Sequence, residues 1–316
     1  MPAANRVPAA PVDEPRNGVL AGVVAYGMWG LFPLYFHQLD GVSAIEILAH
    51  RVLWSLVVTA ALSAITRRRG TRSSPRPSPA LLRRLAAAAA LIALNWLVYI
   101  WAVNHGHVVE AALGYFINPL VTVGLGVGAL GERLRRTQWA AVAVAGMAVV
   151  VLTFAYGRPP LVSLVLAMSF AGYGYLKKSV PLGATDSLLG ETVLLAPFAL
   201  GTAVVLEVNG TATFIHAGGS VTGLLLLAGP VTTVPLVLFA AAARRIPLSL
   251  LGLLQYLTPV GQFLCGVLVL GERLSTERWI GFGLVWIALA ILSADALHHR
   301  PERADRTSPL HLGGAR

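Results

Sequence analysis

The chain has 316 residues, of which 56% are apolar and only 12% are charged. A soluble domain usually carries about twice that share of charged residues, so this composition excludes an ordinary soluble fold. The formal charge of +10 does not indicate nucleic-acid binding, because the positive residues are spread over short polar breaks and no basic motif with interleaved aromatic residues accompanies them.

Apolar runs of roughly 18 to 22 residues alternate with these polar breaks, and that length matches the hydrocarbon width of a bilayer. In chain order, the predicted spans cover residues 18–36, 45–65, 82–101, 108–130, 137–155, 160–176, 187–206, 220–242, 247–270 and 278–294. We therefore predict an all-α integral membrane protein with ten transmembrane helices in a lipid bilayer. Residues 1–17 and 296–316 are predicted to be tails, the second of them disordered.

The distribution of Lys and Arg predicts which side of the membrane is cytoplasmic. If the N-terminus is inside, 20 of the 24 Lys and Arg residues fall in inner segments. Only Arg158, Arg273 and Arg278 then fall outside, and Arg51 lies within a span. We expect a multi-pass protein of the cytoplasmic membrane, with both termini in the cytoplasm.

An internal repeat relates the two halves of the chain. Leu113–Leu152 matches Leu253–Leu292 at a fixed offset of 140 residues, and a Gly-Glu-Arg-Leu turn recurs at 131–134 and 271–274. Each half, 18–155 and 156–295, contains five predicted spans. Because five is odd, the second half must enter the membrane with the opposite orientation, which predicts two inverted five-helix repeats.

Inverted repeats are typical of secondary transporters, whose substrate site lies near the midplane between the halves. We therefore predict a secondary transporter that moves a small, amphipathic metabolite or drug by alternating access. A duplicated channel and a polytopic membrane enzyme remain the alternatives. The chain lacks a Gly-rich phosphate-binding loop with Lys-Ser/Thr, which argues against ATP-driven pumping, and its single cysteine, Cys265, excludes a cysteine-based zinc site. We expect no cofactor and no metal. The oligomeric state stays open.

Several short strings carry a resemblance to a known family. They are Ala25–Gly30, Glu46–Arg51, Asn95–Tyr99, Gly114–Pro119, Thr232–Pro235 and Leu254–Tyr256. With them the chain resembles the EamA branch of the drug/metabolite transporter superfamily, and more narrowly the RarD-type permeases. The resemblance implies a ten-helix permease for a small molecule, and it does not supply the substrate.

Glu46, His50 and Arg51 are the strongest candidates for a functional site, because charged side chains inside a membrane span are costly. Glu46 and His50 are four residues apart and share a helix face, and Arg51 could pair with an acid. If transport is coupled to protons, His50 or Glu46 would titrate. The alternative for Glu46 is a capping box with Ser43, three residues earlier.

Aromatic, amide and proline residues complete the predicted pathway. The side chains expected to form cavity walls are those of Trp29, Tyr35, Asn118, Gln255 and Tyr256. Pro119 and Pro259 occupy matching places in the repeat, and proline removes a backbone donor and loosens a helix. We interpret the two prolines as hinges, with a simple packing kink as the alternative.

Overall fold

The computed structural model describes residues 13–68, 78–130, 135–178, 180–243, 245–246 and 254–298. Every regular element within these residues is a helix. The first half contains α1 (Asp13–Gly30), α2 (Phe32–His37), α3 (Ala44–Arg68), α4 (Pro79–Asn104), α5 (Val108–Leu130) and α6 (Arg136–Tyr156). The second half contains α7 (Leu161–Lys178), α8 (Ala184–Val208), α9 (Gly219–Ala243), α11 (Leu257–Leu264), the π-helical turn η1 (Cys265–Val269) and α12 (Thr276–His298).

Seven of these segments are long and apolar enough to cross a bilayer, with α1 and α2 counted as one segment over Arg16–His37. Three further apolar helices are shorter, at Val108–Thr122, Leu161–Lys177 and Leu257–Val269. The prediction of an all-α integral membrane protein is therefore confirmed. Each of these apolar segments overlaps one of the predicted ranges, although α1 begins at Asp13, inside the predicted tail, and part of the predicted range 247–270 lies outside the described residues.

Local sequence explains where several helices begin and end. Ser78 caps α4, since its hydroxyl accepts a hydrogen bond from the backbone N–H of Leu81 at 3.2 Å, and Pro79 follows at the first helical position. The end of α6 is Gly157, whose φ of 66° lies in the left-handed region that glycine adopts without strain. Capping residues of this kind fix where these two helices begin and end.

The first span is broken at Leu31, between α1 and α2. Pro33 has no N–H, so the carbonyl of Trp29 loses its partner within the helix. The amide of Gln262 in α11 donates to that carbonyl at 3.2 Å. Gly30 and Gly261 allow this approach, because a Cβ on Gly261 would lie 2.9 Å from the Cα of Gly30. The break in one half of the chain is thus stabilised by a helix of the other half.

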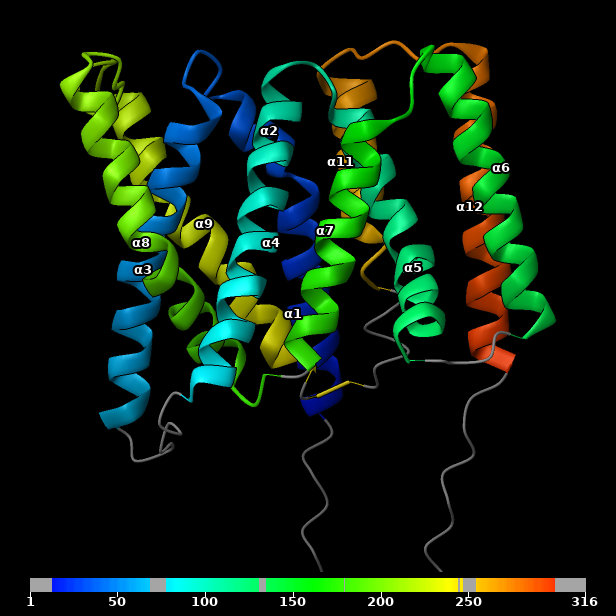
Figure 1. Cartoon of the computed structure of the whole chain (residues 1–316), viewed down its shortest axis with the longest axis horizontal. Helices are drawn as coiled ribbons and strands as arrows, with labels where there is room; N and C mark the ends of the chain where they lie inside the picture. The colour runs from blue at the N-terminus through cyan, green and yellow to red at the C-terminus, as the bar shows by residue number, and fades with distance from the viewer. Residues whose placement is uncertain are drawn as a thin grey trace, which may run out of the picture.

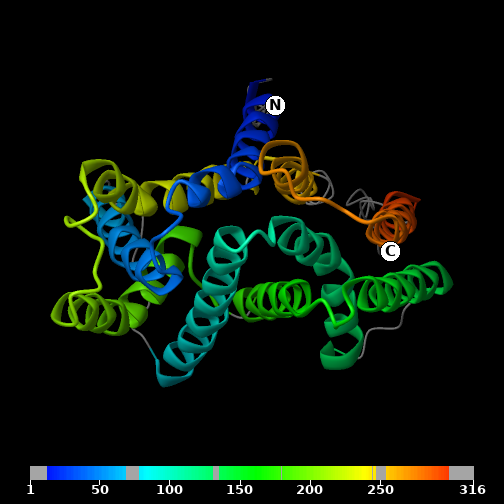
Figure 2. The ribbon, with the colours of Figure 1, turned by 90° about the horizontal axis from the view of Figure 1, so that it is seen from above.

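Helix pairs connect the two halves throughout the molecule (Figures 1 and 2). The closest pairs are α6 with α12, α3 with α8 and α9, α7 with α4 and α5, α1 with α9 and α11, α8 with α4, and α5 with α11. Seen from above, α6 and α12 stand at one end and α3 and α8 at the other, with α4, α5, α7, α1 and α11 between them (Figure 2).

Two large apolar clusters fill the space between the helices. One joins α5, α6 and α12 through residues such as Phe116, Leu152 and Phe282. The other joins α2, α3 and α4 through Phe36, Ile47 and other fully buried side chains. The second cluster includes residues of the candidate site described next.

Candidate substrate pathway

Arg51 lies in the interior of α3 and is only 3% exposed. Its Nε donates a hydrogen bond to the Thr232 hydroxyl of α9 at 2.8 Å. This is the only hydrogen bond of the guanidinium within the described residues, and its buried Nη1 has no partner there. Arg51 therefore links the first half of the chain to the second and retains an unused donor.

Aromatic rings from α2 and α4 surround the guanidinium. Its Cζ lies 4.1 Å from the ring centroid of Trp96, 5.5 Å from that of Phe32 and 5.4 Å from that of Phe36. A cation over an aromatic face gains about 2 kcal/mol when both are removed from water. Tyr35 and Tyr99 extend this cluster, with ring centroids 5.0 Å and 6.0 Å from that of Phe36.

No carboxylate among the described residues lies within 4.0 Å of Arg51. Removing a charge from water costs several kcal/mol even after the protein relaxes, and arginine stays protonated in proteins. The cation–π contacts and one hydrogen bond offset part of this cost. The arrangement is an aromatic cage around a cation without a carboxylate partner in the described part of the chain.

Other polar atoms on the surrounding helices are also buried without a partner among the described residues. They are the hydroxyl oxygens of Tyr99 and Thr233, the amide oxygen of Gln262 and the amide oxygen of Asn118. Buried polar groups are normally hydrogen-bonded, so such a set marks positions where a ligand could satisfy them.

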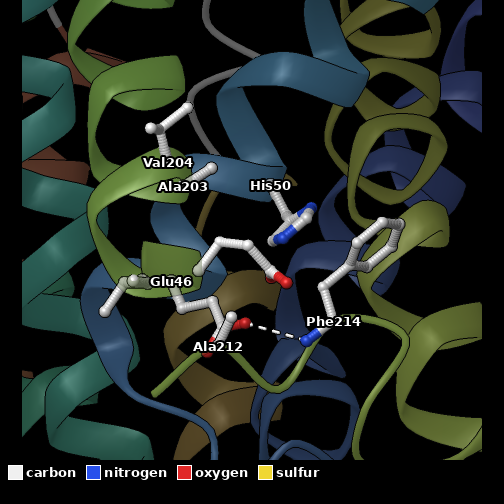
Figure 3. Close-up of a pocket in the computed structure, with 8 residues that line it drawn as sticks. Glu46, His50, Ala203, Val204, Ala212 and Phe214 are labelled. Carbon is white, nitrogen blue, oxygen red and sulfur yellow. Dashed lines mark hydrogen bonds between the residues drawn. The ribbon is translucent and has the colours of Figure 1, made fainter. Parts of the chain in front are cut away.

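Glu46 and His50 lie on a different side of α3 from the aromatic cage. Both line an open cavity of about 230 Å³ together with Ala203, Val204, Leu206, Glu207, Ala212 and Phe214 (Figure 3). The ring of Phe214 packs against His50, with centroids 4.4 Å apart and the ring planes tilted by 35°. His50 Nδ1 accepts a hydrogen bond from the indole N–H of Trp54 at 3.2 Å, which places the proton of the neutral ring on Nε2. Glu46 and His50 do share a face, as their spacing predicted.

The Glu46 carboxylate holds the connection between α8 and α9. Its Oε1 accepts a hydrogen bond from the backbone N–H of Thr213 at 2.7 Å. It accepts a second from the backbone N–H of Phe214 at 3.0 Å (Figure 3). Half of the expected capping box forms, because the Ser43 hydroxyl accepts from the backbone N–H of Glu46 at 3.3 Å. The Glu46 side chain, however, bonds a connection 167 residues away. Its second oxygen is buried without a partner within the described part of the chain.

The remaining predicted wall residues divide between two regions. Tyr35 lies beside the aromatic cage, and its hydroxyl donates to the carbonyl of Leu224 in α9 at 2.6 Å. Trp29 packs on Tyr26 and Phe239 with centroids 5.5 and 6.0 Å away. The three other wall residues are half-buried: Asn118 lies in α5, and Gln255 and Tyr256 lie directly before α11.

The two predicted hinge prolines differ in their surroundings. Pro119 lies inside α5, where it removes one internal hydrogen bond. Pro259 is the third residue of α11, close behind a turn at Gln255 and Tyr256 and shortly before the π-helical η1. Both lie in helices with irregular backbone pairing, and such irregularities are common at functional sites of membrane helices.

Comparison with known proteins gives the family. The EamA-like transporter family matches residues 16–154. Protein RarD of Streptomyces exfoliatus is 52% identical over 90% of this chain and 90% of its own length. Protein RarD of Escherichia coli strain K12 is 43% identical over 90% and 96%, and an uncharacterized transporter of Pseudomonas aeruginosa is 44% identical over 89% and 94%. The chain belongs to the EamA-like transporters and is a RarD-type permease.

A crystal structure of another protein has the same fold. It covers 89% of this chain and 98% of its own, with a TM-score of 0.58 and 20% identity, and at that identity the likeness concerns the fold alone. Three of the relatives, from Pseudomonas aeruginosa, Vibrio cholerae and Bacillus subtilis, are named as uncharacterized transporters. This RarD-type permease is therefore a multi-pass membrane protein of a transporter family.

The second Gly-Glu-Arg-Leu turn of the RarD-type permease has a specific contact. Glu272 accepts hydrogen bonds from the backbone N–H groups of Val108 and Val109 at 2.5 and 2.9 Å, so it caps the start of α5. Burial raises the pKa of the Glu272 carboxyl, and these two donors and Arg278 oppose the rise. The first such turn, 131–134, lies outside the described residues.

Sequence reasoning missed several residues around Arg51 in this RarD-type permease, namely the aromatic residues Phe32, Phe36, Trp96 and Tyr99 and the hydrogen-bond partner Thr232. Trp96 and Thr232 stand inside the strings that carried the family resemblance, and Trp96 and Tyr99 are three residues apart on one face of α4. That spacing was a signal, although an aromatic pair on an apolar helix usually belongs to the core.

Proposed function

We propose that this RarD-type permease is a secondary transporter of a small amphipathic molecule that works by alternating access between two inverted five-helix repeats. The pairing of the helices carries the proposal. If α1, α3, α4, α5 and α6 are exchanged with α7, α8, α9, α11 and α12, the main contacts between helices reproduce themselves. The pair α1 and α9 becomes α7 and α4, and the pair α3 and α9 becomes α8 and α4.

Three pairs map onto themselves under the same exchange, namely α3 with α8, α5 with α11 and α6 with α12. Successive spans run alternately up and down, so that α1 rises and its counterpart α7 descends (Figure 1). A pseudo-twofold axis that relates oppositely directed helices lies in the membrane plane, as in many secondary transporters. This arrangement supports an exchange of roles between the two halves during transport.

The charge distribution supports a cytoplasmic location for both termini. The start of α1 and the end of α12 lie on the same side of the helix bundle (Figure 1). The helix ends and caps on that side carry Arg16, Arg68, Arg83, Arg84, Arg135, Arg136 and Lys177. The opposite side carries Arg158, Arg273 and Arg278. We assign the first side to the cytoplasm by the positive-inside rule.

The substrate path in this proposal runs along α3. Arg51 and its aromatic cage form the central part, and the Glu46 and His50 cavity forms the part nearer the outer connection between α8 and α9. Trp29, Tyr35, Asn118, Gln255 and Tyr256 contribute walls, and Pro119 and Pro259 act as hinges. Either Glu46 or His50 provides the titrating group if transport is coupled to protons.

Single cysteines test the inverted arrangement. In a Cys265→Ser background, one cysteine replaces Glu132 and, in a second protein, one replaces Glu272, and each is labelled with an impermeant maleimide in oriented membrane vesicles. The Cys265→Ser protein without an added cysteine serves as the unlabelled control, and Cys265 itself is buried. We expect labelling from opposite faces. Labelling of both turns from one face would remove the inverted repeat and the proposed mechanism with it.

Uptake into proteoliposomes tests transport itself. A panel of metabolites and amphenicols is applied to liposomes that contain the purified protein. A secondary transporter gives uptake that saturates with substrate concentration and leaves the molecule chemically unchanged. Flux that rises linearly without saturation would favour a channel, and a chemically altered product would favour a membrane enzyme.

A further inference from the structure

We propose that the substrate is a monoanion, an acid group such as a carboxylate on a flat apolar body, and that Arg51 binds the acid group while the aromatic cage contacts the body. The inference rests on the proposed transport function, and it names the chemical class of the substrate.

Arg51 differs from the other buried charged side chains in its partners. Three buried carboxylates have a basic partner, Glu191 with Lys177 at 2.6 Å, Asp295 with Arg135 at 2.8 Å and Glu110 with Arg158 at 3.3 Å. Glu46 receives two backbone N–H groups instead. Within the described residues, Arg51 is the buried Lys or Arg side chain without a carboxylate partner. A missing counter-charge at this depth is most simply supplied by a ligand.

The donor geometry of Arg51 fits an acid group. The guanidinium lies over the Trp96 ring, with Cζ 4.1 Å from the ring centroid, and its N–H groups lie in the plane of the guanidinium. Thr232 uses Nε, while the buried Nη1 has no partner among the described residues. A planar guanidinium binds a carboxylate more strongly than a neutral acceptor, because these hydrogen bonds are charge-assisted. The available donor therefore selects an anionic oxygen.

Charge balance limits the substrate to a single negative charge. One cation is present in the aromatic cage, so a monoanion gives a neutral complex inside the membrane. A dianion would leave one uncompensated negative charge in a medium of low dielectric constant, and a cation would be repelled by Arg51. The rings of Phe32, Phe36 and Trp96 offer flat apolar contact to the rest of the molecule.

Three small probes that share one ring separate charge from shape. The full-length protein, purified in detergent, is titrated with benzoate, benzamide and benzylamine, and binding is followed by Trp fluorescence and by thermal shift. We expect benzoate to quench fluorescence and raise the unfolding temperature, with benzamide and benzylamine at least about tenfold weaker. Equal binding of benzoate and benzamide to the wild-type protein would overturn the inference without any variant.

Variants locate the charge. Arg51→Gln should weaken benzoate binding at least about tenfold and leave benzamide binding unchanged, and Arg51→Lys should bind benzoate at an intermediate level. The matched control is Arg273→Gln, which removes the same charge from an exposed position and should bind benzoate like the wild type. Unchanged benzoate binding by Arg51→Gln would also overturn the inference. The wild-type comparison of the probes decides the question if this variant does not fold.

The failure of this inference can be told apart from a failure of the transport proposal. Saturable uptake of a neutral compound by wild-type protein that does not prefer benzoate would leave transport intact and remove the anion site. Selective benzoate binding at Arg51 without saturable uptake of any acid would keep the anion site and remove the transport proposal.

Discussion

The contact between α3 and α9 beside Arg51 gives the sharpest stability prediction. Gly229 of α9 packs directly on the backbone of α3. A Cβ added there would lie 2.4 Å from the carbonyl carbon of Trp54 and 2.5 Å from its oxygen. Backbone atoms cannot rotate away as the end of a side chain can. In Gly229→Ala the two helices must therefore move apart by about 1 Å to restore ordinary contact distances.

The magnitude follows from two opposing effects. Overpacking of this kind costs about 1–3 kcal/mol, while replacing a helical glycine with alanine gains about 0.5–1 kcal/mol. The matched control is Gly223→Ala on the same helix, where an added Cβ would meet nothing within 4 Å and only the gain applies. The two variants should thus differ in free energy of unfolding by about 1–3 kcal/mol, with Gly229→Ala the less stable.

The same displacement reaches the candidate site. Thr232 is one turn beyond Gly229 and Arg51 is one turn before Trp54, so separating the helices lengthens the 2.8 Å hydrogen bond between Arg51 and Thr232. Thermal unfolding of the purified variants in detergent measures the stability difference, which should appear as roughly 2–6 °C. An unfolding temperature for Gly229→Ala equal to or above that of Gly223→Ala would refute the close packing described here.

Three further predictions concern other parts of the protein. Replacing both Pro119 and Pro259 with Ala should slow transport more than it lowers protein abundance, and an unchanged rate of uptake would assign both prolines to packing. Glu46→Ala should lower the free energy of unfolding by about 1–3 kcal/mol and speed amide exchange at Thr213 and Phe214, because it leaves their two N–H groups unpaired. The control variant Glu46→Gln keeps an acceptor for these groups. Equal amide exchange in the two variants would contradict this prediction. The Glu272 carboxyl has a raised pKa in the folded protein, so its protonated form stabilises the protein at low pH. The unfolding temperature of the wild type relative to that of Glu272→Gln should therefore fall as pH rises from the ordinary pKa near 4.5 through the raised value. A difference that stays constant with pH would show that burial does not shift this group.

Much of the fold was predictable because a bilayer imposes a length on every apolar helix. The expected spans at 108–130 and 137–155 differ from α5 and α6 by no more than one residue at either end. The break at Leu31 was not predicted, although Pro33 was a local signal for it. Its stabilisation by Gln262 depends on a contact across 233 residues, and no local pattern contains that contact.

The candidate site shows the same division on a single helix. Its spacing alone placed Glu46 and His50 on one face of α3, and both line the same cavity. We expected that Arg51 could pair with an acid, but it has no carboxylate partner among the described residues. A helix turns by about 100° per residue, so the side chain of Arg51 meets other neighbours than that of His50. Trp96 and Thr232 meet its guanidinium there.

The sequence by itself determined that this protein is a helical membrane protein, roughly where its apolar helices lie, and which buried charges stand out. Those properties depend on apolar length and on residue type, and both are local. Only the tertiary structure decided that Glu46 holds the connection between α8 and α9, and that Arg51 lies inside an aromatic cage with no carboxylate beside it among the described residues. Partners across the bundle come from helices far apart in the chain. Their choice depends on how whole helix surfaces pack, which the pattern along any one helix does not contain.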